Sequence, residues 1–261
     1  MSSYQVPETT DIVFVDTLNL PINIGADCWG RSRPQIVLIS VYIHLKSSFL
    51  TAAGSSDNVT DSVHYGHLTK SITALVEERP NSFSNERELG SAVASAAFEL
   101  AGESAAAVRV VIESPKQILL AEGIVVDTLV PRSFHPNLAS GSFPPGKIMI
   151  KDLVLAVIIG VNPPEREAKQ RVITNITFYE SGGGGAVGAR VDYPQVVKKL
   201  AQEIEQTSYL TLEKFVMEIV RSACLSSESI LAVTVRAQKP SALSFAHSSG
   251  VEITRSRSAF T

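Results

Sequence analysis

The chain has 261 residues, 44% of them hydrophobic and 19% charged, and its net charge of −3 provides no basic surface of the kind that binds nucleic acid or anionic lipid. No apolar run reaches the roughly 18 residues of a membrane-spanning helix, so we expect no membrane partner. The two cysteines, Cys28 and Cys224, rule out a disulfide framework. The five histidines lack metal-ligand spacing, so we expect no protein-bound metal.

The first half of the chain predicts the order strand, strand, helix, helix, strand, strand. Alternating apolar and polar residues indicate the strands, and apolar residues three and four positions apart indicate the helices. These elements lie at residues 11–24, 34–46, 66–79, 86–102, 106–114 and 123–130. Residues 131–146 follow, and their Pro, Ser and Gly content predicts a linker.

The second half of the chain predicts the same order again. Its elements lie at residues 147–159, 170–180, 193–206, 211–225, 230–238 and 250–258. The two helices carry the clearest periodicity, in "VVKKLAQEI" and "LEKFVMEIV". The chain is therefore expected to contain two copies of one α+β unit, each a four-stranded antiparallel sheet with two helices on one face.

Matching landmarks support this duplication. "RPQIVLISVYIHL" at 33–45 resembles "AKQRVITNITFYE" at 168–180, with the two glutamines 135 positions apart. The matched pairs are Gly25 with Gly160, Gln35 with Gln170, Tyr65 with Tyr193, and Gly123 with Gly250. Their order is kept while the spacing shortens slowly, which is typical of duplicated domains rather than of a solenoid. We therefore expect copy one at 1–130, a linker at 131–146 and copy two at 147–261.

Each tyrosine of this set stands at a strand-to-helix corner. Tyr65 precedes a glycine in "DSVHYGHLTKSI", and Tyr193 precedes a proline in "ARVDYPQVVKKL". A side chain at such a corner can be held firmly and still be exposed.

Open sheet edges are the second consequence of this architecture. A four-stranded sheet with helices on one face leaves two edges that invite pairing, and closed symmetric rings remove such edges. The sequence therefore predicts a homo-oligomeric β-barrel ring rather than a monomer.

Five segments carry a resemblance to a known family. They are "IG...W....PQ" (24–35), "SDNVTDSVHYGHL" (56–68), "IGVNPPEREAKQ" (159–170), "YLTLEKFVMEI" (209–219) and "VTVRAQKP...GVEITR" (233–255). Together they resemble dihydroneopterin aldolases, folate-pathway enzymes with the tunnelling fold. The tandem arrangement is similar to the aldolase part of fungal folate enzymes, in which pyrophosphokinase and pteroate synthase domains follow. Membership of a multifunctional folate-synthesis polypeptide therefore stays open, and we expect a cytoplasmic location, with mitochondrial association as an open alternative.

The resemblance implies an active site shared between two neighbouring domains. In copy two it assigns catalytic roles to Glu165 and Lys239 and substrate binding to Glu213 and Leu212. From copy one it takes the catalytic Tyr65 and the substrate-binding Val63. Glu165, Glu213 and Lys239 are called the complete set below.

Copy one lacks this set. Gly30 stands where the first glutamate belongs, Arg87 stands at the Leu-Glu position, and the lysine position falls near Ser114. Lys116 is close but lies beyond Pro115 and out of register. An arginine has only donors and cannot accept the hydrogens of a pterin edge. The resemblance thus implies one functional set per chain, and a mainly structural role for Tyr193.

The residue types suit a metal-free retro-aldol cleavage of 7,8-dihydroneopterin. A carboxylate such as that of Glu213 matches the adjacent ring N–H and amino groups of a pterin bidentately. Lys239 is the candidate general base, directly or through water, and Tyr65 can relay a proton. Glu165 orients Lys239 and the substrate hydroxyls. The ring C=N accepts the electrons, so we expect no cofactor.

Other functions stay open at this point. A non-catalytic pterin-binding or assembly module and an epimerase-type activity fit the same resemblance, whereas the missing zinc-ligand pattern argues against a cyclohydrolase. The resemblance also implies two chains per ring and four chains in a stacked pair of rings. The sequence does not tell whether Tyr65 comes from the same chain or from a partner.

Overall fold

The computed structural model describes residues 11–78, 83–138, 142–182 and 191–261. In copy one the elements are β1 (Ile12–Ile22), β2 (Gln35–Leu45), α1 (Thr51–Ser56), α2 (Tyr65–Glu78), α3 (Glu86–Ala101), β3 (Ala105–Ser114), β4 (Gly123–Pro131) and α4 (His135–Leu138). In copy two they are β5 (Gly146–Val157), α5 (Pro163–Glu167), β6 (Gln170–Glu180), α6 (Tyr193–Ile204), α7 (Leu212–Leu225), β7 (Ile230–Lys239) and β8 (Ser249–Ser256). No helix within these described ranges is long and apolar enough to cross a membrane.

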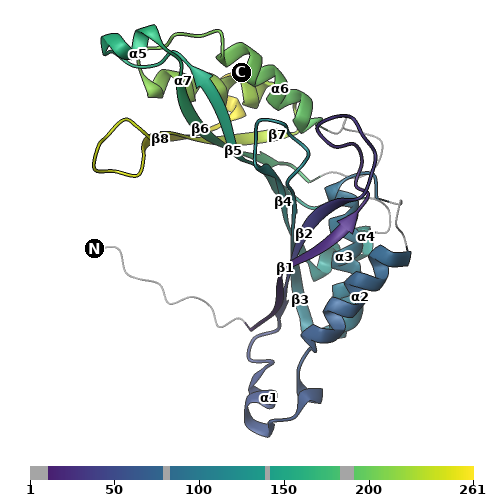
Figure 1. Ribbon diagram of the computed structural model, residues 1–261. Coiled ribbons are helices and arrows are strands. Elements are labelled where there is room, and N and C mark those ends of the chain that lie inside the picture. Colours follow the sequence, from purple (N-terminus) through teal and green to yellow (C-terminus); the bar gives the residue numbers. More distant parts are fainter. Residues whose placement is uncertain (1–10, 79–82, 139–141, 183–190) are drawn as a thin grey trace, which may run out of the picture.

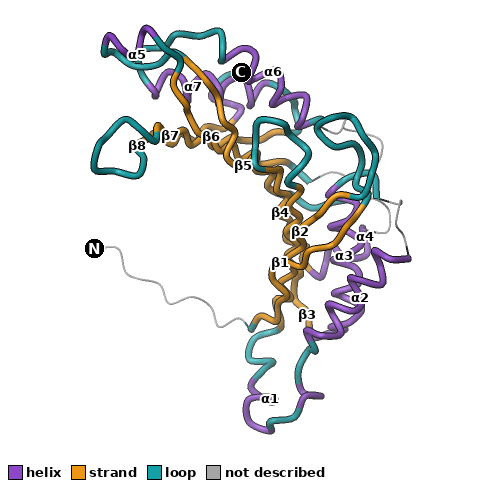
Figure 2. Tube along the Cα trace, viewed as in Figure 1, coloured by secondary structure: helices purple, strands orange, loops and turns teal. Residues whose placement is uncertain are grey.

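The eight strands form one continuous antiparallel sheet in the order β1 to β8. The sequence predicts a four-stranded sheet in each copy, and the pairing of β4 with β5 joins these two sheets into one. The sheet curves into an arc, with the main helices of both copies on its convex side (Figures 1 and 2). In the described part of the chain, β1 and β8 each pair on one side only, so both ends of the arc are open edges.

Each copy has its own hydrophobic core between the sheet and its helices. In β2 every second side chain is buried, as alternation on a half-covered sheet requires. In α2 the buried residues are Leu68, Ile72 and Val76, one helical turn apart. Three buried residues of copy one belong to the core of copy two: Ile118, from the loop after β3, and Ile124 and Val126, from β4.

The repeat extends to the details of the backbone. Bulges interrupt β1 between Val15 and Leu18 and β5 between Ile150 and Leu153, again 135 positions apart. The helices α3 and α7 both begin after a side-chain cap, Asn85 in one and Thr211 in the other, 126 positions apart. Copy one can therefore be aligned with copy two residue by residue, and each copy serves as an internal reference for the other.

The segment expected to be a linker is partly structured. A 3₁₀ turn at Arg132–Phe134 and the short helix α4 follow β4 directly, and Leu138 is buried in the core of copy one. Farther on, the guanidinium of Arg87 lies over the ring of Phe143, 4.6 Å from its centroid. Composition predicts a spacer here because Pro, Ser and Gly dominate, but the few apolar residues among them find partners.

Candidate functional site

Lys239 and Glu165 form the centre of the candidate site. Lys239 ends β7, Glu165 lies in α5, and Lys239 Nζ is 2.5 Å from Glu165 Oε1. Both side chains are largely buried, at 12% and 21% exposure. Lys239 Nζ also lies 3.5 Å from the carbonyl oxygen of Ile159. The structure thus brings together two residues that are 74 positions apart in the sequence.

The second carboxylate oxygen of Glu165 is held by its own loop. Oε2 accepts hydrogen bonds from the backbone N–H of Val161 and of Asn162 and from the Asn162 side-chain amide, at 2.9–3.1 Å. The bond from Lys239, followed by that from the Asn162 backbone, lowers the pKa of Glu165 to about 2. Glu165 is therefore an anion at any physiological pH, which suits it to orient Lys239 and not to donate a proton.

Gly160 makes this arrangement possible. Its φ of +125° is a conformation that side chains rarely adopt, and a Cβ here would lie 2.2 Å from the Glu165 carboxylate. The glycine of the "IG" landmark thus leaves the space that the carboxylate occupies.

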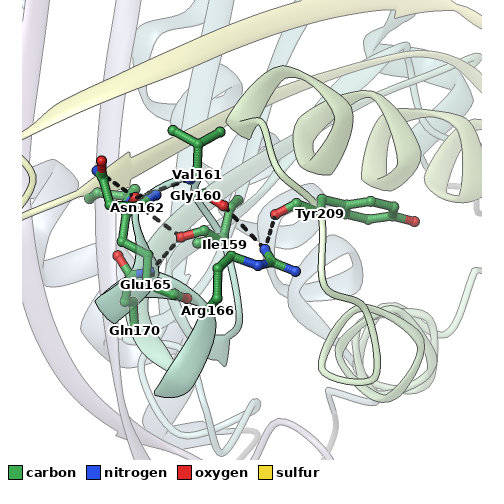
Figure 3. Close-up of polar contacts among 9 residues, drawn as sticks. Ile159, Gly160, Val161, Asn162, Glu165, Arg166, Gln170 and Tyr209 are labelled. Carbon is green, nitrogen blue, oxygen red and sulfur yellow. Dashed lines mark hydrogen bonds and ion pairs between the residues drawn. The ribbon is translucent and has the colours of Figure 1, made fainter.

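A clamp of side-chain donors fixes the loop from its other side (Figure 3). Arg166 donates to the carbonyl oxygens of Gly160, Tyr209 and Ser208, at 3.2, 3.1 and 2.8 Å. Gln170 donates to the carbonyl oxygen of Ile159, at 2.5 Å. Arg166 therefore ties the loop that carries Glu165 to the segment that leads into α7.

Glu213 lies in the first turn of α7, at the end of that segment. Its side chain is exposed, and it makes no hydrogen bond or ion pair to any residue that the structure describes. The first N–H groups of a helix have no partner within it, so the backbone beside Glu213 also offers donors. Leu212 is half-buried against the core of copy two, and Leu210, two residues before it, is exposed, as is Val161 in the clamped loop. Across the described ranges, no group of three or more His, Cys, Asp or Glu side chains is arranged to hold a metal ion.

The matching positions of copy one carry a different arrangement. Strand pairing aligns Ser114 with Lys239, and the helix caps align Arg87 with Glu213. Arg87 forms an ion pair with Glu180 of copy two, and Glu180 also accepts a hydrogen bond from Tyr193. All three side chains are buried or nearly so, and burial raises the pKa of the Tyr193 hydroxyl. Between the two copies of one chain, the place that Glu213 has in copy two is thus taken by Arg87, which is part of an internal ion pair.

Tyr65 is exposed, whereas its counterpart Tyr193 is buried. It begins α2, its side chain is 66% exposed, and the residue aligned with Glu180 is Leu45, which is buried. No carboxylate at that position engages the Tyr65 hydroxyl. Val63 just before it is buried in the core of copy one, so that only its main chain is available to a ligand.

Tyr65 and the complete set do not meet within one chain. The α2 start lies beside α1 at one end of the arc, whereas α5 and the end of β7 lie toward the other end (Figure 1). The tyrosine corner that copy two turns toward copy one is that of Tyr193, which shares Glu180 with Arg87 of copy one. Within one chain, Tyr65 therefore lies away from Lys239 and Glu165 (Figure 1).

The junction between the copies shows how large such a shared site is. A cavity of about 800 Å³ lies between the copy-one loops at 24–28 and 117–120 and helix α6 of copy two. Ligand pockets for small molecules typically measure about 300–1,000 Å³. The corresponding walls beside the complete set are the loop around Gly160 and the loop after β7.

Comparison with known proteins decides the family. The family model for FolB, dihydroneopterin aldolase, matches the chain twice, over residues 13–127 and 148–254. The chain belongs to the dihydroneopterin aldolase family. This confirms the resemblance found in the sequence, and the two matches correspond to the two copies.

The chain is similar to several individual proteins of known name or structure. Folic acid synthesis protein fol1 of Schizosaccharomyces pombe is 30% identical over 251 residues, which are 96% of this chain and 31% of that protein. This chain thus spans about a third of the length of that relative. A dihydroneopterin triphosphate 2'-epimerase of Pseudomonas aeruginosa is 25% identical over 122 residues, 45% of this chain and 96% of that enzyme. A uricase structure from Bacillus fastidious shares the fold over 97% of this chain and 94% of that one, with a TM-score of 0.64 and 12% identity.

Several residues of this aldolase-family site were missed by sequence reasoning. Gln170 was a landmark of the repeat without a role, and Asn162 and Arg166 were only part of the "IGVNPPEREAKQ" segment. Each acts on the backbone or on Glu165, so its function depends on the folded loop. The alignment of the copies contains one signal: Arg31, aligned with Arg166, is preceded by Gly30, where copy two has Glu165.

Proposed function

We propose that this chain is a dihydroneopterin aldolase that cleaves 7,8-dihydroneopterin without a metal. The observation that carries the proposal is the Lys239–Glu165 pair, which sits beside a loop clamped to the start of α7, where Glu213 is free to bind a ligand. Copy one has Ser114, Gly30 and Arg87 at these positions, so we propose one active site per chain.

In the proposed reaction Glu213 binds the pterin ring through its carboxylate, which accepts from the adjacent ring N–H and amino groups. Lys239, directly or through a water, takes the proton of the hydroxyl on the second side-chain carbon. The bond between the first and second side-chain carbons breaks, glycolaldehyde leaves, and the electron pair moves into the ring C=N. Protonation of the first side-chain carbon then gives 6-hydroxymethyl-7,8-dihydropterin.

The partner's Tyr65 completes this site in our proposal. Its hydroxyl is exposed and lacks the carboxylate that engages Tyr193, so it is free to relay the second proton. Two chains joined at both open edges would form a ring of four copies in which copy one and copy two alternate, and two such rings would stack into an assembly of four chains. Each complete set would then face a Tyr65.

Product analysis tests the proposed reaction. Purified protein is incubated with 7,8-dihydroneopterin in the presence and absence of EDTA, and the pterin and the aldehyde are quantified. We expect equal amounts of 6-hydroxymethyl-7,8-dihydropterin and glycolaldehyde, at a rate that EDTA does not change. Activity that EDTA removes and zinc restores contradicts the metal-free mechanism, and tight binding without turnover supports a binding module instead.

An epimerase activity is the second candidate, because the Pseudomonas aeruginosa relative is named as one. Epimerisation at the second side-chain carbon can use the same bond cleavage if the aldehyde is retained and added back to its other face. The same product analysis distinguishes the two outcomes, since epimerisation gives the 2'-epimer of the substrate and no free glycolaldehyde.

We propose that this chain is part of a larger enzyme in the cell. The Schizosaccharomyces pombe relative is named a folic acid synthesis protein and is about three times as long. Antibodies against this chain, used on a denaturing gel of cell extract, would detect a polypeptide much longer than 261 residues. A band at the size of this chain alone contradicts the proposal.

The Arg166 clamp gives a prediction for the proposed reaction. Arg166→Ala frees the Glu165 loop from the 208–209 segment, so the distance between Lys239 and Glu213 is no longer fixed. Misplacement of catalytic groups by about 1 Å costs up to about 10²-fold, so we expect kcat/KM to fall about 10- to 10²-fold, with most of the loss in kcat. Steady-state kinetics measure it.

Arg31→Ala is the matched control for this variant. Arg31 is aligned with Arg166 in copy one, and its exposed side chain makes no hydrogen bond or ion pair to the described residues. Arg166→Lys should recover only part of the activity, because an ammonium cannot hold three carbonyl groups in one plane. Wild-type kcat/KM in Arg166→Ala, or an equal loss in Arg31→Ala, contradicts the positioning role.

A further inference from the structure

The tyrosine corner of copy one is capped by a histidine. His64 precedes Tyr65, the first residue of α2, and His64 Nδ1 accepts a hydrogen bond from the backbone N–H of Gly66 at 3.0 Å. This N–H is one of the first in the helix, which have no partner within it, and a side-chain acceptor at the N-cap satisfies such a group. The His64 carbonyl accepts from the N–H of His67 and of Leu68, at 3.0 and 3.1 Å, so His64 is the N-cap residue.

The hydrogen bond to Gly66 also defines the state of this imidazole. Nδ1 accepts only when it carries no proton, so the ring of His64 is neutral and its remaining N–H is at Nε2. The ring of His67 stacks on it, with centroids 4.5 Å apart and planes at 15°. Two stacked imidazolium ions would repel each other, so the stacking also fits a neutral ring. His64 thus caps the helix without a charge.

Gly66 leaves the space that this cap needs. A Cβ on Gly66 would lie 2.8 Å from Cε1 and 3.1 Å from Nδ1 of His64, so one of the two groups would have to shift. The glycine of "HYGH" therefore lets the imidazole lie over the first turn of α2. The same imidazole lies beside the ring of Tyr65, with centroids 5.6 Å apart and planes at 46°. The cap and the tyrosine are thus in contact at the corner.

Copy two caps the aligned helix with a carboxylate. Asp192 corresponds to His64, and its side chain accepts from the Gln195 N–H at 3.0 Å. The tyrosine that follows it, Tyr193, is buried and bonded to Glu180. The charged cap therefore belongs to the copy whose tyrosine is internal, and the neutral cap belongs to the copy whose tyrosine is exposed.

We propose that His64 is a positioning residue for the aldolase reaction, which fixes the Tyr65 corner through an uncharged cap. This inference rests on the proposed function, in which Tyr65 relays the second proton. A tyrosine that has given up its proton is an anion, and the N-terminus of a helix favours a negative charge. A carboxylate at the cap would oppose that charge. His64 satisfies the helix and leaves the favourable field of the helix at Tyr65.

Three substitutions of His64 separate the cap from its charge. His64→Asn keeps a neutral cap, so kcat for dihydroneopterin cleavage should stay within about threefold of wild type. His64→Ala removes the cap and loosens the corner, so we expect kcat to fall about tenfold, with KM near the wild-type value because Tyr65 acts on the chemical step. His64→Asp keeps the cap but adds a negative charge, and kcat should fall by about the same factor. Steady-state kinetics measure all three.

Asp192→Ala is the matched control, because it removes the aligned cap beside the internal Tyr193 and should leave kcat unchanged. Hydrogen–deuterium exchange over residues 63–70, measured by mass spectrometry on the whole protein, reports the cap without turnover. Exchange should be faster than wild type in His64→Ala and unchanged in the other two His64 variants.

Two kinetic results overturn the inference: wild-type kcat in His64→Ala, or the same kcat in His64→Asp as in His64→Asn. Unchanged exchange in His64→Ala also overturns it, because the cap would then not hold the corner. These failures differ from a failure of the proposed function. A wild-type protein that does not cleave dihydroneopterin contradicts the proposed function and this inference with it, whereas an active wild type with an equally active His64→Ala contradicts the inference alone.

Discussion

Replacing Lys239 by alanine is expected to lower kcat for dihydroneopterin cleavage by about 10²- to 10⁴-fold, the usual share of a general base. The side chain is largely buried and held by the Glu165 carboxylate and the Ile159 carbonyl, so no other residue of the chain replaces it. Because Lys239 acts on the side-chain hydroxyl and not on the pterin ring, KM should stay near the wild-type value. Steady-state kinetics separate the two parameters.

Two variants act as controls for this result. Glu213→Ala removes the pterin-binding carboxylate, so it should raise KM much more than it lowers kcat. Lys116→Ala removes the exposed copy-one lysine that stands near the matching position but out of register, and it should change neither parameter. A kcat within about threefold of wild type in Lys239→Ala is less than a general base contributes and would mean that another group takes the proton.

Sequence alone predicts much of each copy, because local patterns determine it. The alternation in "QIVLISVYIHL" predicts β2 within a residue at either end, and the repeat predicts that Ser114 and Arg87 stand where copy two has Lys239 and Glu213. The short helices α1, α4 and α5 were not predicted. They have six residues or fewer, which is too short for a helical period to be recognised.

Contacts between the copies could not be predicted in the same way. Nothing local distinguishes Glu180 at the end of a strand from other strand-end acids, and its pairing with Arg87 and Tyr193 arises only when β4 and β5 join. The same holds for Ile118, a loop residue that lies in the core of the other copy. These contacts are informative because, among the residues that the structure describes, Glu213 and Tyr65 have no counterparts of them.

The two junctions of this repeat therefore have different tasks. Between β4 and β5, a buried arginine, glutamate and tyrosine satisfy one another, and such an arrangement leaves no acceptor for a pterin. At the aligned positions of the two open ends the chain has an exposed Glu213 in place of Arg87, a buried Leu45 in place of Glu180 and an exposed Tyr65 in place of Tyr193. One junction has thus become structural, whereas in our proposal the groups at the open ends bind the substrate.

Two inactive variants are expected to restore activity to each other if Tyr65 crosses between chains. Tyr65→Phe removes the hydroxyl that we assign to proton relay, and Lys239→Ala removes the base. In a ring of one chain of each kind, one site combines the intact Lys239 of the first with the intact Tyr65 of the second, and the other site lacks both. Co-expression in equal amounts should therefore yield roughly a quarter of the wild-type activity, because half of the rings are mixed and each mixed ring has one working site.

The double variant Tyr65→Phe/Lys239→Ala, co-expressed with wild type, is the matched control. Its mixed rings contain two incomplete sites, one without the hydroxyl and one without the base, so activity should come only from the rings that are wholly wild type. Tyr193→Phe in place of Tyr65→Phe gives a second control: its hydroxyl is bound to Glu180 inside the chain, so this variant should be active without any partner. If mixing Tyr65→Phe with Lys239→Ala restores nothing although mixed assemblies form, each site draws its tyrosine from its own chain. That outcome would require copy one to fold back onto the far side of copy two, away from the β4–β5 junction that now joins them.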